Sequence, residues 1–268
     1  QKTVRAKEES EKKKEAQKAA KSTAESQKAK STDDTDPARL KRKLPVLETT
    51  GASGTTDKSG TANSILKDEI GNLNQITGFV PDDSVAKSVT ITYRPESTVY
   101  VAERYGVFYE DDTWKDIEHS GKDDEEEMWE HMEDYLSCPT DLQKLTRYYI
   151  EEIGGIDGEW KDSKSEIEAI RKKICEALWE LAVYDTEPGA TPAGKDFVEY
   201  FLFENRKGFC VHFASAGTLL FRLAGKEARY AEGYAVPASA FEEQEDGTYQ
   251  AQISGAMGHA WCQVWCLD

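Results

Sequence analysis

Apolar residues recur at helical spacing in three parts of the chain. The clearest run spans residues 164–183, where one stripe contains Ile167, Ile170, Ile174, Leu178 and Leu181. A shorter run over residues 141–153 stops at Gly154 and Gly155, and a third run begins at Cys210. Apolar positions three and four residues apart mark one face of an α-helix. We therefore predict three amphipathic helices.

Alternating patterns typical of strands occupy much of the remaining sequence after residue 64. Residues 89–93 and 99–102 alternate and are rich in β-branched and aromatic side chains, and residues 106–109 extend this unit. Residues 229–236 and 260–267 are predicted as strands that pack on the helix beginning at Cys210. The order of these elements favours an α+β fold over a parallel βαβ sheet.

The first 64 residues differ in composition from the rest. They contain no aromatic residue, and Lys, Glu, Ala, Ser and Thr dominate them. The apolar positions of residues 5–30 are nearly all alanine, so a helix there offers no face to bury. We expect residues 1–64 to be a disordered or weakly helical tether. Binding of this basic tail to anionic lipid headgroups is an alternative, which its interleaved glutamates disfavour.

The charge is unevenly distributed along the chain. Residues 1–64 hold 15 Lys and Arg against 10 Asp and Glu, whereas the rest hold 19 against 41. This acidic body argues against nucleic acid as a partner. No stretch approaches the ~18 consecutive apolar residues that predict a membrane span. The acidic run 123–133 lacks the ligand spacing of an EF-hand, so we interpret it as a solvated helix face, not a calcium site.

Cys210 is the leading candidate for chemistry. It follows the turn residue Gly208 and opens an apolar helix, where free N–H groups and the helix dipole favour a thiolate. A buried core cysteine is the alternative interpretation. About fifty residues later, His259 opens a predicted strand. A cysteine nucleophile and a remote histidine base are the minimum needed for covalent acyl transfer.

Geometry limits which neighbours can join this pair. His212 lies about 200° around the helix from Cys210, so we assign it a structural or cleft-lining role. Strand alternation puts His259 and Trp261 on one face and Cys262 on the other. A zinc site built from Cys210, His212, His259 and Cys262 would therefore close poorly, and we expect neither a metal nor a cofactor. Five cysteines give no clear disulfide framework.

Three motifs resemble those of the bacterial transglutaminase-like superfamily. Residues 206–216, preceded by residues 200–203, resemble its cysteine motif; residues 228–234 resemble its second signature, and residues 258–261 its histidine motif. They occur in the family's order and cover roughly residues 140–268. Residues 100–114 more weakly resemble a small β-rich segment that precedes the catalytic domain in membrane-anchored members.

The resemblance implies a papain-like α+β core with a Cys-His-Asp triad. Cys210 would be the nucleophile and His259 the base. Phe209, His212, Tyr234 and Trp261 would line the cleft or the oxyanion site. The family's aspartate lies about fifteen residues past the histidine, so we do not assign that role to Asp268, and we expect the triad to be completed beyond this sequence.

Composition and the resemblance together give three expected regions: a tether over residues 1–64, a small β-rich segment over 65–136 and a C-terminally truncated transglutaminase-like domain over 137–268. We expect acyl transfer from protein or peptide amides through a thioester. A papain-like protease or amidase using water, and a catalytically silent surface scaffold, remain alternatives. By the same resemblance, the site of action is extracellular or at the cell surface, with membrane anchorage in a longer parent protein.

Overall fold

The computed structural model describes residues 46–49, 70–82, 85, 87–117, 131–154 and 164–266. Residues Leu44–Asp268 form one compact unit. The tether predicted over residues 1–64 lies outside the described residues apart from one short strand. Most of the acidic run 123–133 and Asp268 also lie outside them.

The described elements combine strands and helices in nearly equal measure. The strands are β1 (Val46–Thr49), β2 (Lys87–Ile91), β3 (Val99–Gly106), β4 (Phe108–Glu110), β5 (Thr113–Lys115), β6 (Val183–Tyr184), β7 (Lys207–Gly208), β8 (Ala228–Val236), β9 (Glu242–Glu243), β10 (Tyr249–Ile253) and β11 (Gly258–Val264). The α-helices are α3 (Gln143–Tyr148), α4 (Lys164–Leu181), α5 (Phe197–Tyr200) and α6 (Cys210–Leu223). Helices α3 and α5 continue as π-helical turns over Tyr149–Gly154 and Phe201–Asn205.

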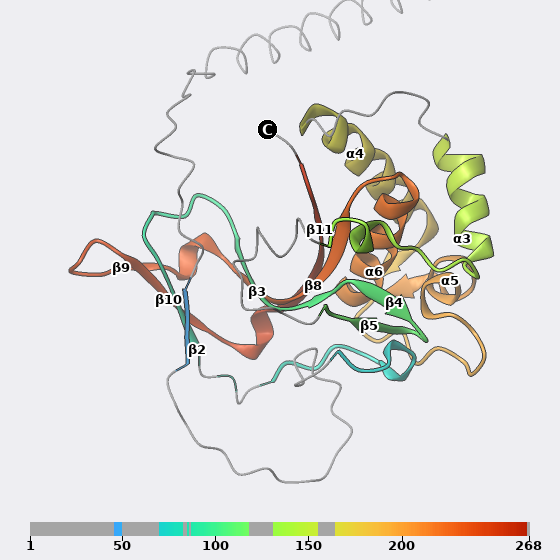
Figure 1. The fold of residues 1–268 in the computed structure, drawn as a ribbon. Coiled ribbons are helices and arrows are strands. Elements are labelled where there is room, and N and C mark those ends of the chain that lie inside the picture. The colour runs from blue at the N-terminus through green and yellow to red at the C-terminus, as the bar shows by residue number, and fades with distance from the viewer. Residues whose placement is uncertain are drawn as a thin grey trace, which may run out of the picture. The chain divides into compact units, whose positions relative to one another are not determined.

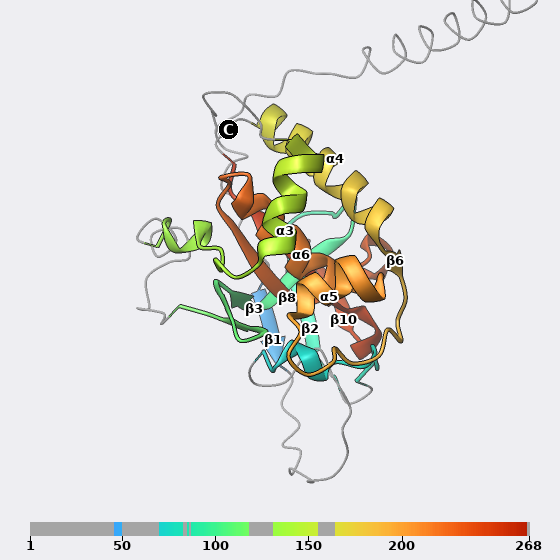
Figure 2. The same cartoon turned by 90° about the vertical axis from the view of Figure 1, so that its right-hand side faces the viewer.

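The sheet at the centre of the unit has the strand order β11-β8-β3 and is antiparallel throughout. Helix α6 packs against β8 and β11, and the helices gather on one side of the strands (Figures 1 and 2). The predicted α+β class, with a cysteine helix on antiparallel strands, is confirmed. Among the described strands, the short β6–β7 pair alone is parallel.

The structure differs from the predicted division into a β-rich segment and a catalytic domain. Strand β2 pairs with β10 in a second sheet of order β1-β2-β10-β9, and β3 pairs with β8 in the central sheet. The predicted β-rich segment over residues 65–136 thus supplies strands to each of the two larger sheets. Pairing between strands far apart in sequence leaves no local signal, which is why the pattern along the chain could not reveal it.

Helix α6 is the most deeply buried element of the described chain, with all but two of its residues buried. Helix α4 covers it with the predicted stripe, whose central members Ile170, Ile174 and Leu178 are buried in the same core cluster. Each such side chain contributes about 1.5–3 kcal/mol by leaving water. Cys210 therefore sits at the end of a helix that the core holds in place.

Trp114 connects the small β4–β5 hairpin to the cysteine helix. Its indole Nε1 donates to the Ser215 hydroxyl at 2.9 Å, and its ring stacks on Tyr230 with centroids 5.3 Å apart. Gly106 provides the space, because a Cβ there would lie 2.5 Å from the Trp114 Cβ. The hairpin, α6 and β8 are thus joined through one buried aromatic pair.

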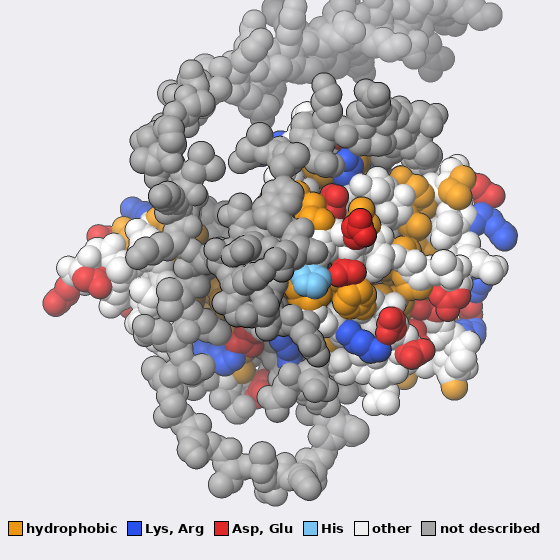
Figure 3. All heavy atoms as spheres, viewed as in Figure 1, with side chains coloured by type: hydrophobic (Ala, Val, Ile, Leu, Met, Phe, Trp, Pro, Cys, Tyr) orange, Lys and Arg blue, Asp and Glu red, His pale blue; other side chains and the backbone are white. Residues whose placement is uncertain are grey.

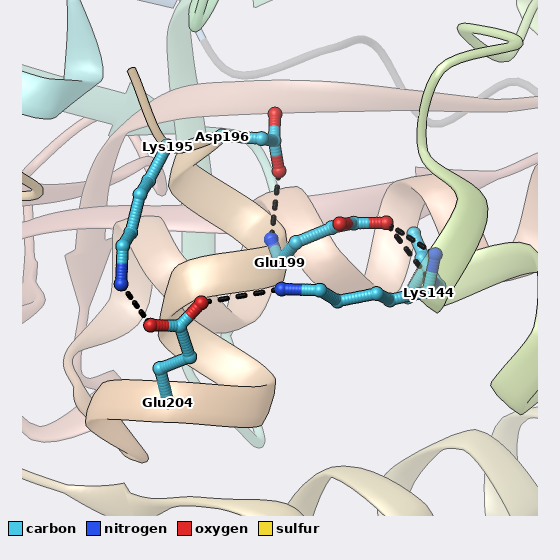
Figure 4. Close-up of polar contacts among 6 residues, drawn as sticks. Lys144, Lys195, Asp196, Glu199 and Glu204 are labelled. Atoms are coloured by element: carbon cyan, nitrogen blue, oxygen red, sulfur yellow. Dashed lines mark hydrogen bonds and ion pairs between the residues drawn. The ribbon is translucent and has the colours of Figure 1, made fainter. Parts of the chain in front are cut away.

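A polar network fixes α5, the short helix that leads to the cysteine (Figure 4). The Asp196 carboxylate caps α5 by accepting from the Glu199 N–H at 2.7 Å. Glu199 Oε1 in turn accepts from the backbone N–H of Lys144 at 2.6 Å and of Leu145 at 3.1 Å, at the start of α3. Glu204 pairs with Lys144 and Lys195. Side chains thereby satisfy helix-end N–H groups that lack partners within their helices.

The surface of the described chain is mixed in character. On the face seen in Figure 3, acidic and basic side chains are interspersed with hydrophobic ones. Across the described residues, no helix combines the length and apolarity that crossing a membrane requires.

Candidate active site

Helix α6 starts at Cys210 because the preceding residues turn the chain sharply into it. Phe209 is extended, and Gly208 sits where a Cβ would lie 2.6 Å from the Cβ and Cγ of His212 and 2.7 Å from the Phe201 ring. Glycine alone fits this position without moving its neighbours. The glycine before the cysteine is therefore a steric requirement of the helix start.

The Cys210 thiol is nearly enclosed, with 6% of the residue exposed. Burial, with a smaller contribution from the nearby Glu232 carboxylate, raises the pKa of the thiol to about 11, although the backbone N–H groups of Ala260 and Val211 oppose the shift. The prediction that the helix start lowers this pKa is thus wrong for the resting structure, because desolvation outweighs the N–H groups. The thiol is protonated at neutral pH.

His259 directly precedes Ala260 on β11, so the two side chains lie on opposite faces of this strand. Ala260 faces α6 in the main core cluster, whereas the His259 ring lies 5.9 Å from the Tyr100 ring and stacks near Trp261 at 6.4 Å. In the described residues, no hydrogen bond joins the imidazole to the Cys210 thiol. Burial lowers the pKa of His259, so the imidazole is neutral and able to accept a proton.

His212 was predicted to have a structural or cleft-lining role, and its surroundings in the structure indicate the structural role. Its ring is buried between Phe197, Phe201 and Phe209, with centroids 4.5, 5.1 and 5.0 Å away. Its Nδ1 accepts from the Phe209 N–H at 3.4 Å, which caps the start of α6. Burial lowers the pKa of His212 to about 3, so the ring stays neutral.

The other residues expected to line the cleft divide between core and surface. Phe209 and Tyr234 are fully buried, Phe209 in the main core and Tyr234 in the cluster between the two sheets, so the structure corrects their assignment to an open cleft. Trp261 lies beside His259, with its ring 5.1 Å from Tyr100. Of the predicted set, Trp261 is the one that stays next to a candidate catalytic side chain.

The four residues considered for zinc do not converge in the structure. His212 is enclosed by phenylalanine rings, His259 faces Tyr100, and Cys262 packs with the core on the α6 side of the sheet. No three His, Cys, Asp or Glu side chains gather as metal ligands anywhere in the described ranges.

A buried carboxylate close to the thiol escaped the sequence reasoning. Glu232 lies directly opposite Ala260 in the β8–β11 register and is 3% exposed. It accepts from the Tyr230 hydroxyl at 2.6 Å and from Arg104 Nη2 at 3.0 Å. A carboxylate between Ala231 and Gly233, in the middle of a predicted strand, was the signal that could have revealed it.

Tyr184 also escaped prediction, since nothing in the loop before the cysteine motif distinguishes it. It lies opposite Gly208 in the parallel β6–β7 pair, and its ring stacks near Phe213 at 6.0 Å. Burial raises the pKa of its phenol, and the nearby Cys210 thiol raises it too. Half of this tyrosine is exposed, so it stands at the outer side of the buried thiol.

Two curated proteins share similarity with part of this chain. The chain is 34% identical over 86 residues to the uncharacterized protein YebA of Bacillus subtilis (strain 168). It is 38% identical over 82 residues to a protein-glutamine gamma-glutamyltransferase of Pseudomonas aeruginosa. Each alignment covers 31% of this chain, and the chain spans 11% of the length of each of these relatives.

Solved structures of the periplasmic domain of TgpA from Pseudomonas aeruginosa are also similar. One, at 24% identity and a TM-score of 0.35, covers 51% of this chain and 43% of that chain. Another, bound to ethylmercury, is 18% identical with a TM-score of 0.37 and covers 67% of each chain.

The model of the transglutaminase-like superfamily matches residues 155–268, which contain the cysteine, second and histidine motifs. Over this region, the chain is similar to the transglutaminase-like superfamily.

Proposed function

We propose that the protein is a cysteine acyltransferase that forms a thioester between Cys210 and the acyl group of a protein or peptide amide. The observation that carries the proposal is the placement of the Cys210 thiol at the start of a buried helix, against the backbone of Ala260 and next in sequence to His259. Similarity of the matched region to a superfamily of cysteine enzymes supports the same chemistry.

The first half-reaction starts from a neutral thiol and a neutral imidazole. The Cys210 Sγ–H proton passes to His259 while Sγ bonds to the amide carbon, and the carbonyl electron pair moves onto oxygen. The tetrahedral oxyanion then collapses, the C–N bond breaks, and the leaving amine takes the proton back from the imidazolium. The product is a Cys210 thioester and a free amine or ammonia.

The second half-reaction depends on the acceptor. An amine attacks the thioester, loses its proton to His259 and forms a new amide, while the thiol is regenerated. The name of the curated Pseudomonas relative, a protein-glutamine gamma-glutamyltransferase, supports glutamine as acyl donor and an amine as acceptor. With water as acceptor the same steps give hydrolysis.

His259 must turn toward the thiol for either step. Its ring lies against Tyr100 in the resting structure, while its neighbour Ala260 faces the core that contains Cys210. We propose that the ring moves to the thiol when substrate binds, since catalytic hydrogen bonds commonly tighten only in the substrate complex.

The surface beside the thiol suits a peptide. Trp179, Val183 and Tyr184 are each more than half exposed, and the rings of Trp179 and Tyr184 both lie against Phe213. Exposed apolar side chains that cluster beside a reactive group commonly mark a binding surface. We expect the acyl donor to lay a peptide chain across these rings.

A labelled-amine assay tests the proposal. The protein is incubated with a glutamine-containing peptide and dansylcadaverine, and the peptide is analysed by mass spectrometry. We expect the dansyl amine to be incorporated by the native chain and not by Cys210→Ala, with Cys175→Ala as the control that retains activity. Conversion of glutamine to glutamate without amine incorporation would indicate hydrolysis. A peptide that stays unchanged would refute the proposed enzymatic activity.

A catalytically silent binding scaffold is the competing function. The enclosed, protonated thiol and the imidazole that faces Tyr100 favour it. The same assay distinguishes the two functions, since a scaffold binds the peptide across the exposed rings and leaves its amide intact.

The site of action is proposed from the family resemblance. We propose that the protein works outside the cytoplasm, with a protein or peptide as partner and without nucleic acid, and that a longer parent protein anchors it in the membrane. Protease protection in intact cells expressing the parent protein tests this location.

A further inference from the structure

A cavity of about 370 Å³ lies where β8 begins and β11 ends, away from the candidate catalytic pair. One part of its lining is an apolar wall made of Met132, Val264 and Trp265. Val264 follows His259 by five residues on β11, which places it roughly 16 Å from the histidine along an extended strand. A cavity of this volume encloses a small organic molecule, and the acyl-transfer steps do not use it.

The cavity is also lined by a guanidinium that is held in place without being neutralised. Arg229 Nε donates to Gln263 Oε1 at 2.7 Å, and the guanidinium carbon lies 3.5 Å from the centroid of the Tyr105 ring. Among the described residues, the two Nη groups of Arg229 and the Nε2 group of Gln263 have no acceptor. A fixed planar fork with free N–H groups suits a carboxylate, which accepts two parallel hydrogen bonds from it.

The opposite charge lines the same cavity. Glu227 lies two residues before Arg229, and its carboxylate forms no hydrogen bond or ion pair with any residue that the structure describes. Its backbone carbonyl accepts from the Trp265 N–H at 2.9 Å, which holds the end of β11 beside the start of β8. Glu227 repels a simple anion and Arg229 repels a simple cation, so together they favour a ligand that carries both charges.

We propose that this cavity binds the zwitterion of an α-amino acid with an apolar side chain. The α-carboxylate pairs with Arg229 and Gln263, the α-ammonium group pairs with Glu227, and the side chain packs against the apolar wall. The proposal goes beyond acyl transfer at Cys210 and does not depend on it, because the cavity lies apart from the thiol and the imidazole.

Removing one charge at a time from the ligand and from the protein tests the proposal. L-leucine is compared with L-leucinamide, which lacks the carboxylate, and with isocaproate, which lacks the ammonium group. Binding to the chain is measured by saturation-transfer NMR and by calorimetric titration. We expect L-leucine to bind most tightly. Arg229→Gln should weaken L-leucine about 10- to 100-fold, as for a lost charged hydrogen bond, without weakening L-leucinamide. Glu227→Gln should weaken L-leucine without weakening isocaproate.

Arg171→Gln is the matched control, because Arg171 lies on α4 and pairs with Glu168 rather than lining the cavity. This variant should bind L-leucine as the native chain does, and the urea midpoint of each variant checks folding. If Arg229→Gln does not fold, the comparison of L-leucine with isocaproate in Glu227→Gln decides.

Three results would overturn the proposal. The first is no binding of L-leucine, L-methionine or L-phenylalanine to the native chain at millimolar concentration. The second is native affinity for L-leucine in the folded Arg229 and Glu227 variants, and the third is L-leucinamide or isocaproate binding as tightly as L-leucine. Because no readout involves Cys210, each of these results would leave the labelled-amine test of the proposed function unaffected.

Discussion

At the residue scale, the state of the nucleophile is set by competition between burial and backbone donors. The N–H groups at the helix start favour the thiolate, as the sequence suggested, but enclosure and the Glu232 carboxylate outweigh them. The enzyme we propose therefore starts from a thiol and requires His259 as a general base, in contrast to sites that keep a permanent thiolate–imidazolium pair.

Glu232→Gln should lower the pKa of the Cys210 thiol, because it removes a negative charge that disfavours the thiolate. The pH profile of Cys210 alkylation, resolved by peptide mass, would then shift to lower pH. Glu243→Gln, an exposed carboxylate change on β9, serves as the control. A profile that stays in place, or moves to higher pH in a folded variant, would contradict this electrostatic account.

Gly208→Ala tests the steric requirement at the helix start. A Cβ at this position meets His212 and the Phe201 ring at distances that no packed carbon tolerates. We expect a loss of about 1–3 kcal/mol in the free energy of unfolding, as for other overpacked cores, measured by urea titration. Gly71→Ala, where nothing lies within 4 Å, should leave stability nearly unchanged; equal effects of the two changes would refute the steric explanation.

Residue types in the sequence selected Cys210 and His259 as candidates, but did not show their surroundings. Cys210 follows a glycine and opens an apolar run, which is a local pattern. Glu232, which raises the pKa of the thiol, comes from β8 and reaches it only through the fold. Burial of Phe209 and Tyr234 was hidden for the same reason, since an aromatic side chain suits a core and a cleft equally well.

At the element scale, helices were more predictable than strand pairing. Spacing alone predicted the apolar stripe of α4. It also predicted the buried positions in the run over residues 141–153, which are Leu142, Leu145, Tyr149 and Ile153. The spacing did not reveal that helix α3 continues as a π-helical turn after Tyr148. Nor did it show that Glu199 caps this helix from 54 residues away in sequence.

The α5 cap predicts a pH dependence of stability. Burial, and then the neighbouring Asp112, raise the pKa of Asp196 to about 6. The folded state thus holds this proton more tightly than the unfolded state does, so the stabilisation is complete below about pH 4 and is lost as the pH rises through 6. Asn at this position still caps the helix but does not titrate.

We expect the stability of Asp196→Asn relative to the native protein to increase between pH 4 and pH 7, by at most about 3 kcal/mol. Urea titrations at both pH values measure it. Asp246→Asn is the control: the Thr248 hydroxyl and N–H lower the pKa of Asp246, so its contribution titrates below this range and its relative stability should stay nearly constant. If the stability of Asp196→Asn relative to the native protein stays constant or falls as the pH rises, the fold does not raise the pKa of the Asp196 carboxyl group.

At the scale of the whole molecule, the catalytic helix depends on strands that precede the region matched by the family. Strand β3 completes the central sheet, β2 pairs with β10, and Trp114 packs on both β8 and α6. The boundary predicted near residue 137 therefore cuts through the main core cluster, which contains Trp114 as well as the buried residues of α6. Composition and motif spacing could not show this, because neither records which strands pair.

A fragment of residues 137–268 should consequently fail to fold, whereas residues 44–268 should unfold cooperatively. Dispersion of amide proton signals and a urea transition monitored by tryptophan fluorescence distinguish the two. Loss of a central-sheet strand and of the Trp114–Tyr230 stack exposes a large part of the core. A well-dispersed spectrum from residues 137–268 would contradict the claim that the main core requires strands that precede residue 137.

The central claim is that Cys210 becomes acylated with His259 as its base, and a single-turnover acylation rate tests it most directly. The protein is mixed with p-nitrophenyl acetate, and the acetyl adduct is followed by intact mass and located by peptide mapping, for the native chain, Cys210→Ala and His259→Ala. We predict a +42 Da adduct on Cys210, its absence in Cys210→Ala, and a rate about 100-fold lower in His259→Ala, in the range typical of a lost general base. Adducts spread over the other cysteines, or a His259→Ala rate equal to that of the native chain, would contradict the account and favour the silent scaffold.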